Sequence, residues 1–248
     1  MSRQPVILCF GDSNTHGTPP MKSVTDLDRF PPNSRWPGVV RAVLGERAHI
    51  IEEAQPGRTT IYDDPTGGGD RNGLTSLKVA LETHRPLDCV VLMLGTNDLH
   101  ARFNLSAWVI SRNINQLVLK IMQMPCGVIA SEPPKVLLVA PPPVLEQGFP
   151  AEALTGASEK SRQLAKHYEQ VANAADIDFF DAASVISVDP LDGVHFSAES
   201  HVTLGNAIAA RLVDILDLDV ADNGWRQFGR GKRVGKARHG EGAEELEV

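Results

Sequence analysis

A serine, an aspartate and a histidine in this sequence have the types and the spacing that nucleophilic acyl transfer needs. Ser13 lies in the segment FGDSN directly after an apolar run, and Asp192 and His195 lie three residues apart in the segment DGVHF. At that spacing the carboxylate can hold the imidazole in one tautomer, which leaves the other ring nitrogen free to take a serine proton. We therefore interpret Ser13 as a candidate nucleophile, His195 as its general base and Asp192 as the residue that orients the base.

Three hydrogen-bond donors are candidates for an oxyanion hole. They are the backbone N–H groups of Ser13 and Gly57 and the side-chain amide of Asn97, which lie in the segments FGDSN, AQPGRTT and MLGTND. Such donors stabilise the charge that develops on a carbonyl oxygen, and the loss of one typically costs about 2.7–4 kcal/mol in the transition state. Each residue also has a purely structural explanation, as a turn residue, a backbone bend or a helix cap. The catalytic interpretation is favoured because separate strand ends each carry a required residue.

Other residues near these segments are candidates for contacts with the substrate. They are Asp12, His16, Asp98, His100 and Pro143. We expect Asp12 to shape the turn that carries Ser13. His16 is also a rival for the general base because it is close to Ser13 in sequence, but it has no partner carboxylate at a suitable spacing. We therefore rank it below His195.

The alternation of apolar runs and amphipathic stretches predicts the elements that position these residues. We expect strands at 5–10, 48–53, 88–94, 135–140 and 177–181, and helices at 35–46, 72–84, 104–123, 157–175 and 198–216. Several strands are nearly continuous in Val, Ile and Leu, which is typical of parallel strands covered on both faces. A doubly wound parallel sheet brings the segments that follow its strands to one rim. Thr15 replaces the second glycine of Gly-x-Ser-x-Gly, so we expect Ser13 on a looser turn at the start of a helix.

The segments FGDSN, AQPGRTT, MLGTND and DGVHF resemble the four signature blocks of the SGNH hydrolases, also called the GDSL esterase/lipase family. The residues that give the family its name correspond here to Ser13, Gly57, Asn97 and His195. Asp192 completes the triad that the resemblance implies. The resemblance spans residues 5–216.

Longer segments, such as GDSNTHG and KVLLVAPPP, look most like the bacterial arylesterase and acyltransferase branch of that family. The resemblance implies an α/β fold, which is a flavodoxin-like three-layer α/β/α arrangement with a five-stranded parallel sheet in the order 2-1-3-4-5. In this branch the third residue after the serine is commonly Trp. His16 stands at that position here, and this departure concerns the shape of the pocket.

The predicted function is that of a serine esterase that forms an acyl-enzyme on Ser13 and hydrolyses short-acyl esters without a metal or cofactor. The resemblance extends this to acyl transfer to alcohols or peroxide and implies a homo-oligomer. One alternative is a carbohydrate deacetylase of the acetyl-xylan type with the same residues. A scaffold that has lost catalysis and a non-catalytic, phosphate-binding flavodoxin-like module are more distant alternatives. The phosphate-binding module lacks the Gly-x-Gly-x-x-Gly and P-loop lysine signatures.

Composition limits the partners and the compartment. The chain has 248 residues, a net charge of −7 and 42% hydrophobic residues, which suit one α/β domain and argue against a nucleic-acid partner. No apolar run approaches the roughly 18 residues of a membrane span, and the amino-terminal residues do not resemble a signal peptide. We therefore expect no membrane partner, a cytoplasmic location and free cysteines. We expect a hydrolase domain at 1–220 and a charged tail at 221–248, flexible or docked on a partner subunit.

Overall fold

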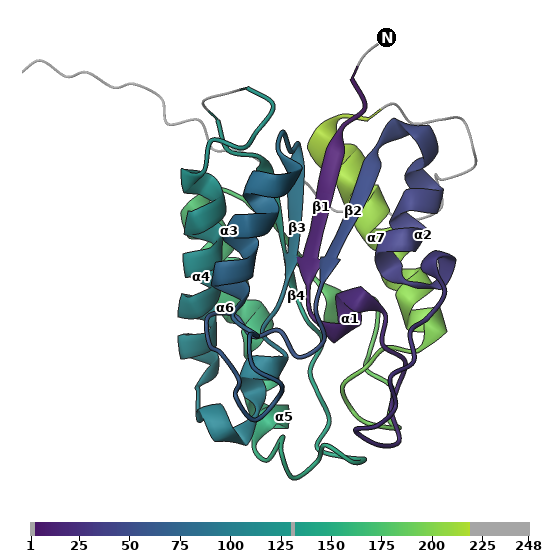
Figure 1. The fold of residues 1–248 in the computed structure, drawn as a ribbon, viewed down its shortest axis with the longest axis vertical. Helices are drawn as coiled ribbons and strands as arrows, with labels where there is room; N and C mark the ends of the chain where they lie inside the picture. The colour runs from purple at the N-terminus through teal and green to yellow at the C-terminus, as the bar shows by residue number, and fades with distance from the viewer. Residues whose placement is uncertain (1–2, 130–131, 219–248) are drawn as a thin grey trace, which may run out of the picture.

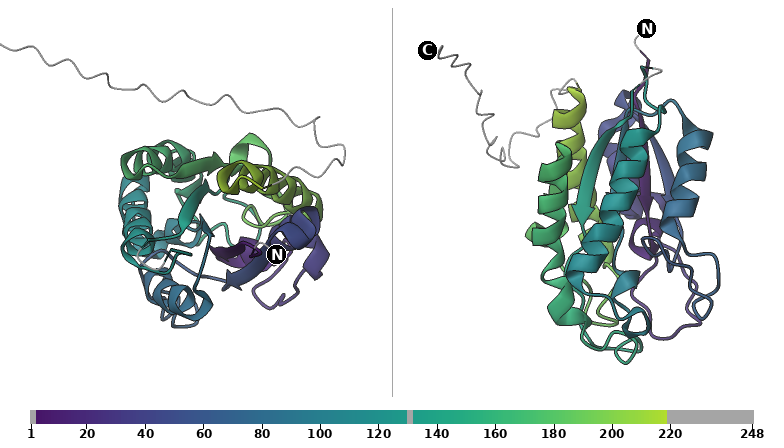
Figure 2. Two further views of the ribbon diagram at one scale, coloured as in Figure 1. Left: turned by 90° about the horizontal axis from the view of Figure 1, so that it is seen from above. Right: turned by 90° about the vertical axis from the view of Figure 1, so that its left-hand side faces the viewer.

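The structure, a computed structural model, describes residues 3–129 and 132–218. Its strands form one parallel sheet in the order β2-β1-β3-β4-β5, with helices on both faces (Figures 1 and 2). The strands are β1 (Val6–Gly11), β2 (His49–Ala54), β3 (Cys89–Met93), β4 (Lys135–Ala140) and β5 (Asp178–Asp181). The predicted three-layer fold and its strand order are confirmed, and each strand boundary lies within one residue of the expected one.

Helices follow the strands nearly as the amphipathic stretches predict. They are α1 (Ser13–His16), α2 (Trp36–Leu44), α3 (Gly73–His84), α4 (Ala107–Gln123), α5 (Ala157–Ser161), α6 (Leu164–Ala175) and α7 (Ala198–Leu216). Short 3-10 helices lie at η1 (Pro32–Ser34), η2 (Gly45–Arg47), η3 (Asn97–Leu99), η4 (Ala101–Phe103) and η5 (Ala182–Ser184).

The prediction of one helix over 157–175 is wrong, because the structure divides this stretch into α5 and α6. Contacts with the segment after β4 hold α5 in place. The Val144 backbone N–H donates to Ser161 Oγ at 3.1 Å, and Ser158 Oγ donates to the Val144 carbonyl at 3.0 Å. The break therefore follows from tertiary contacts, which the amphipathic pattern does not report.

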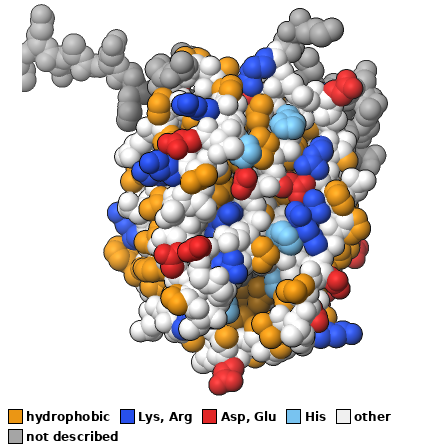
Figure 3. Space-filling view, in the orientation of Figure 1, with side chains coloured by type: hydrophobic (Ala, Val, Ile, Leu, Met, Phe, Trp, Pro, Cys, Tyr) orange, Lys and Arg blue, Asp and Glu red, His pale blue; other side chains and the backbone are white. Residues whose placement is uncertain are grey.

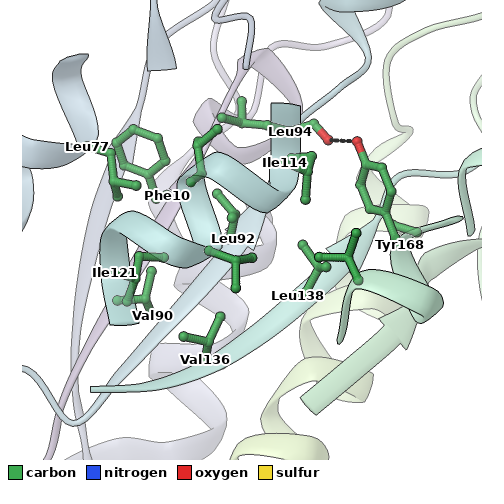
Figure 4. Close-up of a cluster of buried hydrophobic side chains, with 14 of the residues drawn as sticks. Phe10, Leu77, Val90, Leu92, Leu94, Ile114, Ile121, Val136, Leu138 and Tyr168 are labelled. Atoms are coloured by element: carbon green, nitrogen blue, oxygen red, sulfur yellow. Dashed lines mark hydrogen bonds between the residues drawn. The ribbon is translucent and has the colours of Figure 1, made fainter. Parts of the chain in front are cut away.

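Alternating residues of the central strands face two separate hydrophobic clusters. In β3, Val90 and Leu92 belong to the cluster under α3, α4 and α6, whereas Val91 and Met93 belong to the cluster under α2 and α7. Figure 4 shows the first cluster, in which the Tyr168 hydroxyl donates a hydrogen bond to the Leu94 carbonyl at 2.9 Å. The sheet is buried on both faces, so its strand ends are rigid supports for the segments that follow them.

The segments after the strands lie at the carboxyl edge of the sheet, where Figure 1 shows α1 below the end of β1. None of the helices in the described ranges is long and apolar enough to cross a membrane. The predicted tail at 221–248 lies outside the described residues.

Candidate active site

Ser13 is the first residue of α1 and follows the end of β1 after a single intervening residue, Asp12. Asp12 caps the helix, since its carboxylate accepts a hydrogen bond from the Asn14 backbone N–H at 3.0 Å. A side chain at Gly11 would place its Cβ 2.0 Å from Thr15 Oγ1, so only glycine fits at the strand end. Ser13 therefore lies on a turn at the start of a helix, as the sequence predicts.

Ser13, His195 and Asp192 form a continuous chain of hydrogen bonds. His195 Nε2 lies 3.0 Å from Ser13 Oγ, and His195 Nδ1 lies 2.7 Å from Asp192 Oδ2. A carboxylate beside Nδ1 fixes the proton there, so Nε2 accepts from the serine hydroxyl. All three residues are buried, with relative exposures of 6%, 7% and 0% for Ser13, His195 and Asp192. The arrangement can activate a serine as a nucleophile.

Asp192 accepts hydrogen bonds on both oxygens. Oδ2 accepts from His195 Nδ1 and from the Met21 backbone N–H, each at 2.7 Å, and Oδ1 accepts from the backbone N–H groups of Val194 and His195, each at 2.9 Å. Burial alone would raise the pKa of this carboxyl, but the hydrogen bonds and the His195 ring outweigh it and lower the pKa to about 2. Asp192 is therefore ionised at neutral pH.

Two segments, 18–35 and 141–156, hold the loop that carries Asp192 and His195. Met21 belongs to the segment 18–35, and its N–H bonds to Asp192 as described. In the segment 141–156, the Leu145 N–H donates to the Gly193 carbonyl at 2.8 Å. Figure 3 shows the surface hollowed near this end of the molecule, with hydrophobic and histidine side chains around the hollow.

The candidate oxyanion donors lie at the ends of β1, β2 and β3. Gly57 has a φ of +76°, a conformation that glycine adopts without strain. In the parts of the chain that the structure describes, neither the Ser13 nor the Gly57 N–H donates a hydrogen bond to another residue. Asn97 Nδ2 donates to the Arg58 carbonyl at 3.0 Å, which orients its amide next to Gly57.

The model of the GDSL-like lipase/acylhydrolase family matches this chain over residues 9–202. The chain belongs to this family. It is therefore a carboxylic ester hydrolase, as the four sequence blocks predict.

Solved structures of the same family support this assignment. Est24, a carbohydrate acetylesterase from Sinorhizobium meliloti, shares 40% sequence identity with a TM-score of 0.81, and the match covers 86% of this chain and 100% of that one. The aryl esterase of M. smegmatis shares 39% identity with a TM-score of 0.80, over 85% of this chain and 99% of that one. A second carbohydrate acetylesterase family member from Sinorhizobium meliloti shares 36% identity with a TM-score of 0.81, over 87% and 100%. No curated protein matches the chain significantly.

Two of the residues predicted to contact substrate are buried carboxyls in this GDSL-family fold. Asp98 is fully buried and accepts hydrogen bonds from the Thr60 backbone N–H at 2.9 Å and from the Thr60 hydroxyl. Burial raises the pKa of Asp98 to about 7 and that of Asp12 to about 6. Both carboxyls bond to their own chain in this structure, and their predicted contact with substrate stays a prediction.

Neither of the two other candidate histidines bonds to Ser13. His16 is partly exposed, and its Nδ1 lies 3.2 Å from Thr18 Oγ1. His100 Nδ1 lies 2.9 Å from Arg102 Nη1, and burial, together with that guanidinium, lowers the pKa of His100 to about 4. Pro143 is partly exposed in the segment after β4. The structure thus brings His195 to Ser13 and leaves His16 and His100 with other partners.

Sequence reasoning missed two residues that contribute to the site, Met21 and Arg58. Met21 acts through its backbone N–H, so its side-chain type carries no signal. Arg58 is buried directly after Gly57, and the only signal for it is a charged residue inside the segment AQPGRTT. Among the described residues, no group of three His, Cys, Asp or Glu side chains is arranged to hold a metal ion.

Proposed function

We propose that this chain hydrolyses short-acyl esters through an acyl-enzyme on Ser13. The observation that carries the proposal is the hydrogen-bond chain from Ser13 Oγ through His195 to Asp192. His195 Nε2 takes the hydroxyl proton as Oγ attacks the ester carbonyl. The imidazolium then gives that proton to the departing alcohol, and the acyl group stays on Oγ. Water attacks the acyl-enzyme with His195 as base, which releases the acid and restores the serine.

The donors at the three strand ends stabilise the negative charge that each tetrahedral intermediate carries on the former carbonyl oxygen. This role is assigned to the N–H groups of Ser13 and Gly57 and to the amide of Asn97. It is supported by the two N–H groups, which donate no hydrogen bond to any described residue and are therefore free to bind an oxyanion. Asp192 keeps its charge at neutral pH and so stabilises the imidazolium that forms in each step.

A small acyl pocket is favoured by the segments that wall the site. The segment after β4 is rich in proline, which makes it stiff, and it is bonded to the loop that carries the catalytic histidine. The second candidate is a carbohydrate deacetylase, which is supported by the 40% identity with a carbohydrate acetylesterase. Rates on p-nitrophenyl acetate, p-nitrophenyl octanoate, acetylated xylan and triacetylglycerol in one panel separate the two.

The decisive test of the nucleophile is Ser13→Ala. We expect the esterase rate on p-nitrophenyl acetate to fall by at least about 10³-fold and labelling by a fluorophosphonate probe to disappear. The control is Ser184→Ala, an exposed serine in η5, which should keep both. Near-full activity in Ser13→Ala would overturn the proposed function.

Finer features of the function belong to the same proposal. Acyl transfer to an alcohol or peroxide uses the same acyl-enzyme, and the ratio of transferred to hydrolysed product at increasing alcohol concentration measures it. Val24 and Leu27 are exposed apolar side chains in the segment 18–35 and offer contact surface for a homo-oligomer, whose mass light scattering measures. Cys9, Cys89 and Cys126 are free and buried, in agreement with a reducing, cytoplasmic location.

A further inference from the structure

Arg58 is a buried arginine that forms no ion pair with any carboxylate of the described residues. The residue is 5% exposed. The guanidinium lies over the ring of Phe10, 4.2 Å from the centroid, and its Nη1 donates to the carbonyls of Gly11 and Glu53, each at 2.8 Å. Burial lowers the pKa of Arg58 to about 10, so it carries its charge at neutral pH. A charge without an ion pair is costly to bury, so its contacts call for an explanation.

The side chain and the backbone of Arg58 contact every segment that carries a candidate oxyanion donor. Gly11 ends β1 two residues before Ser13, and its carbonyl accepts from the guanidinium. The Arg58 carbonyl accepts from Asn97 Nδ2 at 3.0 Å. The Arg58 N–H donates to the Gln55 carbonyl at 3.1 Å, which closes the turn that contains Gly57.

We infer that Arg58 is a positioning residue for the oxyanion hole, because it holds Gly57 and the Asn97 amide in register with Ser13. The inference rests on the proposed function and goes beyond it, since it assigns a role to a residue outside the triad and the three donors. Oxyanion donors work only at about 2.7–3.1 Å from the developing charge, so their relative placement decides how much they stabilise. The guanidinium bonds two carbonyls through Nη1 while its central carbon lies over the ring of Phe10, and this fixes the placement more rigidly than an ammonium group would.

A role in positioning predicts a different kinetic result from a role in stability alone. Donors that are held less firmly stabilise the transition state less, whereas the binding of substrate in the ground state changes little. The kcat therefore falls while KM stays nearly the same. We expect Arg58→Met to lower kcat on p-nitrophenyl acetate about 10- to 100-fold with KM within about twofold. Affinity for a boronic acid that forms a tetrahedral adduct on Ser13 should fall by a similar factor. Arg58→Lys should recover part of the loss.

The matched control is Arg41→Met. Arg41 also donates to a carbonyl of β2, that of Ile50 at 3.2 Å, but it contacts neither the turn of Gly57 nor Asn97 among its hydrogen bonds. It should keep kcat within about twofold. Rates are measured well below each thermal midpoint and per active site, which fluorophosphonate labelling counts. If Arg58→Met does not fold, Arg58→Lys decides by the same split between kcat and KM.

A double-mutant cycle with Asn97→Ala tests the route. If Arg58 acts partly through the Asn97 amide, the loss of kcat caused by Arg58→Met should be smaller in the Asn97→Ala background. The inference is overturned if folded Arg58→Met has wild-type kcat and boronate affinity, or a loss no larger than that of Arg41→Met; where Arg58→Met does not fold, the same result in Arg58→Lys overturns it. That result leaves the proposed function intact when Ser13→Ala is inactive, whereas an active Ser13→Ala overturns the proposed function itself.

Discussion

At Asp192, burial and hydrogen bonding act on the same carboxyl group in opposite directions. Burial disfavours the charge, but four donated hydrogen bonds, two of them from His195, favour it more strongly, and the pKa falls to about 2. The same contacts fix the direction of the carboxylate and, through it, the tautomer of His195. A group with one oxygen fewer cannot accept all of these bonds.

Replacement of Asp192 by asparagine should therefore lower kcat by roughly 10³- to 10⁴-fold, because the amide nitrogen faces donors and His195 loses its fixed tautomer. Steady-state kinetics on p-nitrophenyl acetate measure this. The control is Asp189→Asn in the same loop, where the one hydrogen bond that the side chain accepts from the described residues comes from the Leu191 N–H at 2.8 Å. Equal kcat in the two variants would contradict the assigned role of Asp192.

Asp98 presents the reverse case, since burial raises its pKa from 3.8 to about 7. Between pH 4 and 7 the folded chain holds this proton more tightly than the unfolded chain, so the free energy of unfolding decreases as the pH rises. Asp98 should make the protein roughly 2–3 kcal/mol less stable at pH 8 than at pH 5.

Asp98→Asn should remove that part of the pH dependence, because its amide can still accept from the Thr60 N–H and donate to the Thr60 hydroxyl. Urea denaturation at the two pH values measures the difference, with the exposed Asp28→Asn as control. Part of the decrease should persist in Asp98→Asn, since burial also raises the pKa of Asp12. An unchanged slope in Asp98→Asn would show that another group is responsible.

At the scale of elements, the strands were predictable because each is a short apolar run between polar segments, and its bounds depend on local composition. The division of the stretch 157–175 into α5 and α6 was not predictable. It depends on hydrogen bonds between Val144, which lies earlier in the chain, and the side chains of Ser158 and Ser161. Local patterns report which face of a segment is apolar, and they do not report which distant backbone group breaks it.

Helix α7 begins three residues after His195, and Ser197 caps it by accepting from the Ser200 N–H at 3.1 Å. Ser197→Ala should lower the free energy of unfolding by about 1 kcal/mol, and Ser197→Asp should restore it. The kcat should change little, because Asp192 holds His195 through both its ring and its backbone N–H. Urea midpoints and kcat for the two variants check this, and a large fall in kcat with unchanged stability would contradict it.

At the scale of the whole molecule, the sheet brings together residues that are far apart in the chain. The hydrogen-bonded arrangement of Ser13, His195 and Asp192 was predictable because these residues carry recognisable side chains at strand ends, and parallel strands share one carboxyl edge. The contacts of Arg58 and the backbone contribution of Met21 were not, because they join atoms 47 and 171 residues apart through carbonyl and N–H groups that every residue has.

The two hydrophobic clusters share the strands between them, so they should unfold together. Leu138 is fully buried on the α4 and α6 side of β4, and Trp36 is fully buried on the other face of the sheet. Leu138→Ala should lower the free energy of unfolding by about 2–5 kcal/mol, since it leaves a cavity in a close-packed core.

The fluorescence of Trp36 can report the unfolding of its own face of the sheet. In a Trp108→Phe, Trp225→Phe background, Trp36 is the sole tryptophan of the chain. The urea midpoint from Trp36 fluorescence should fall as far as the midpoint from far-UV circular dichroism, with kcat at 25 °C kept within about twofold. A Trp36 midpoint that does not move would mean that the two faces unfold separately, and the sheet would then not act as one rigid support for the site.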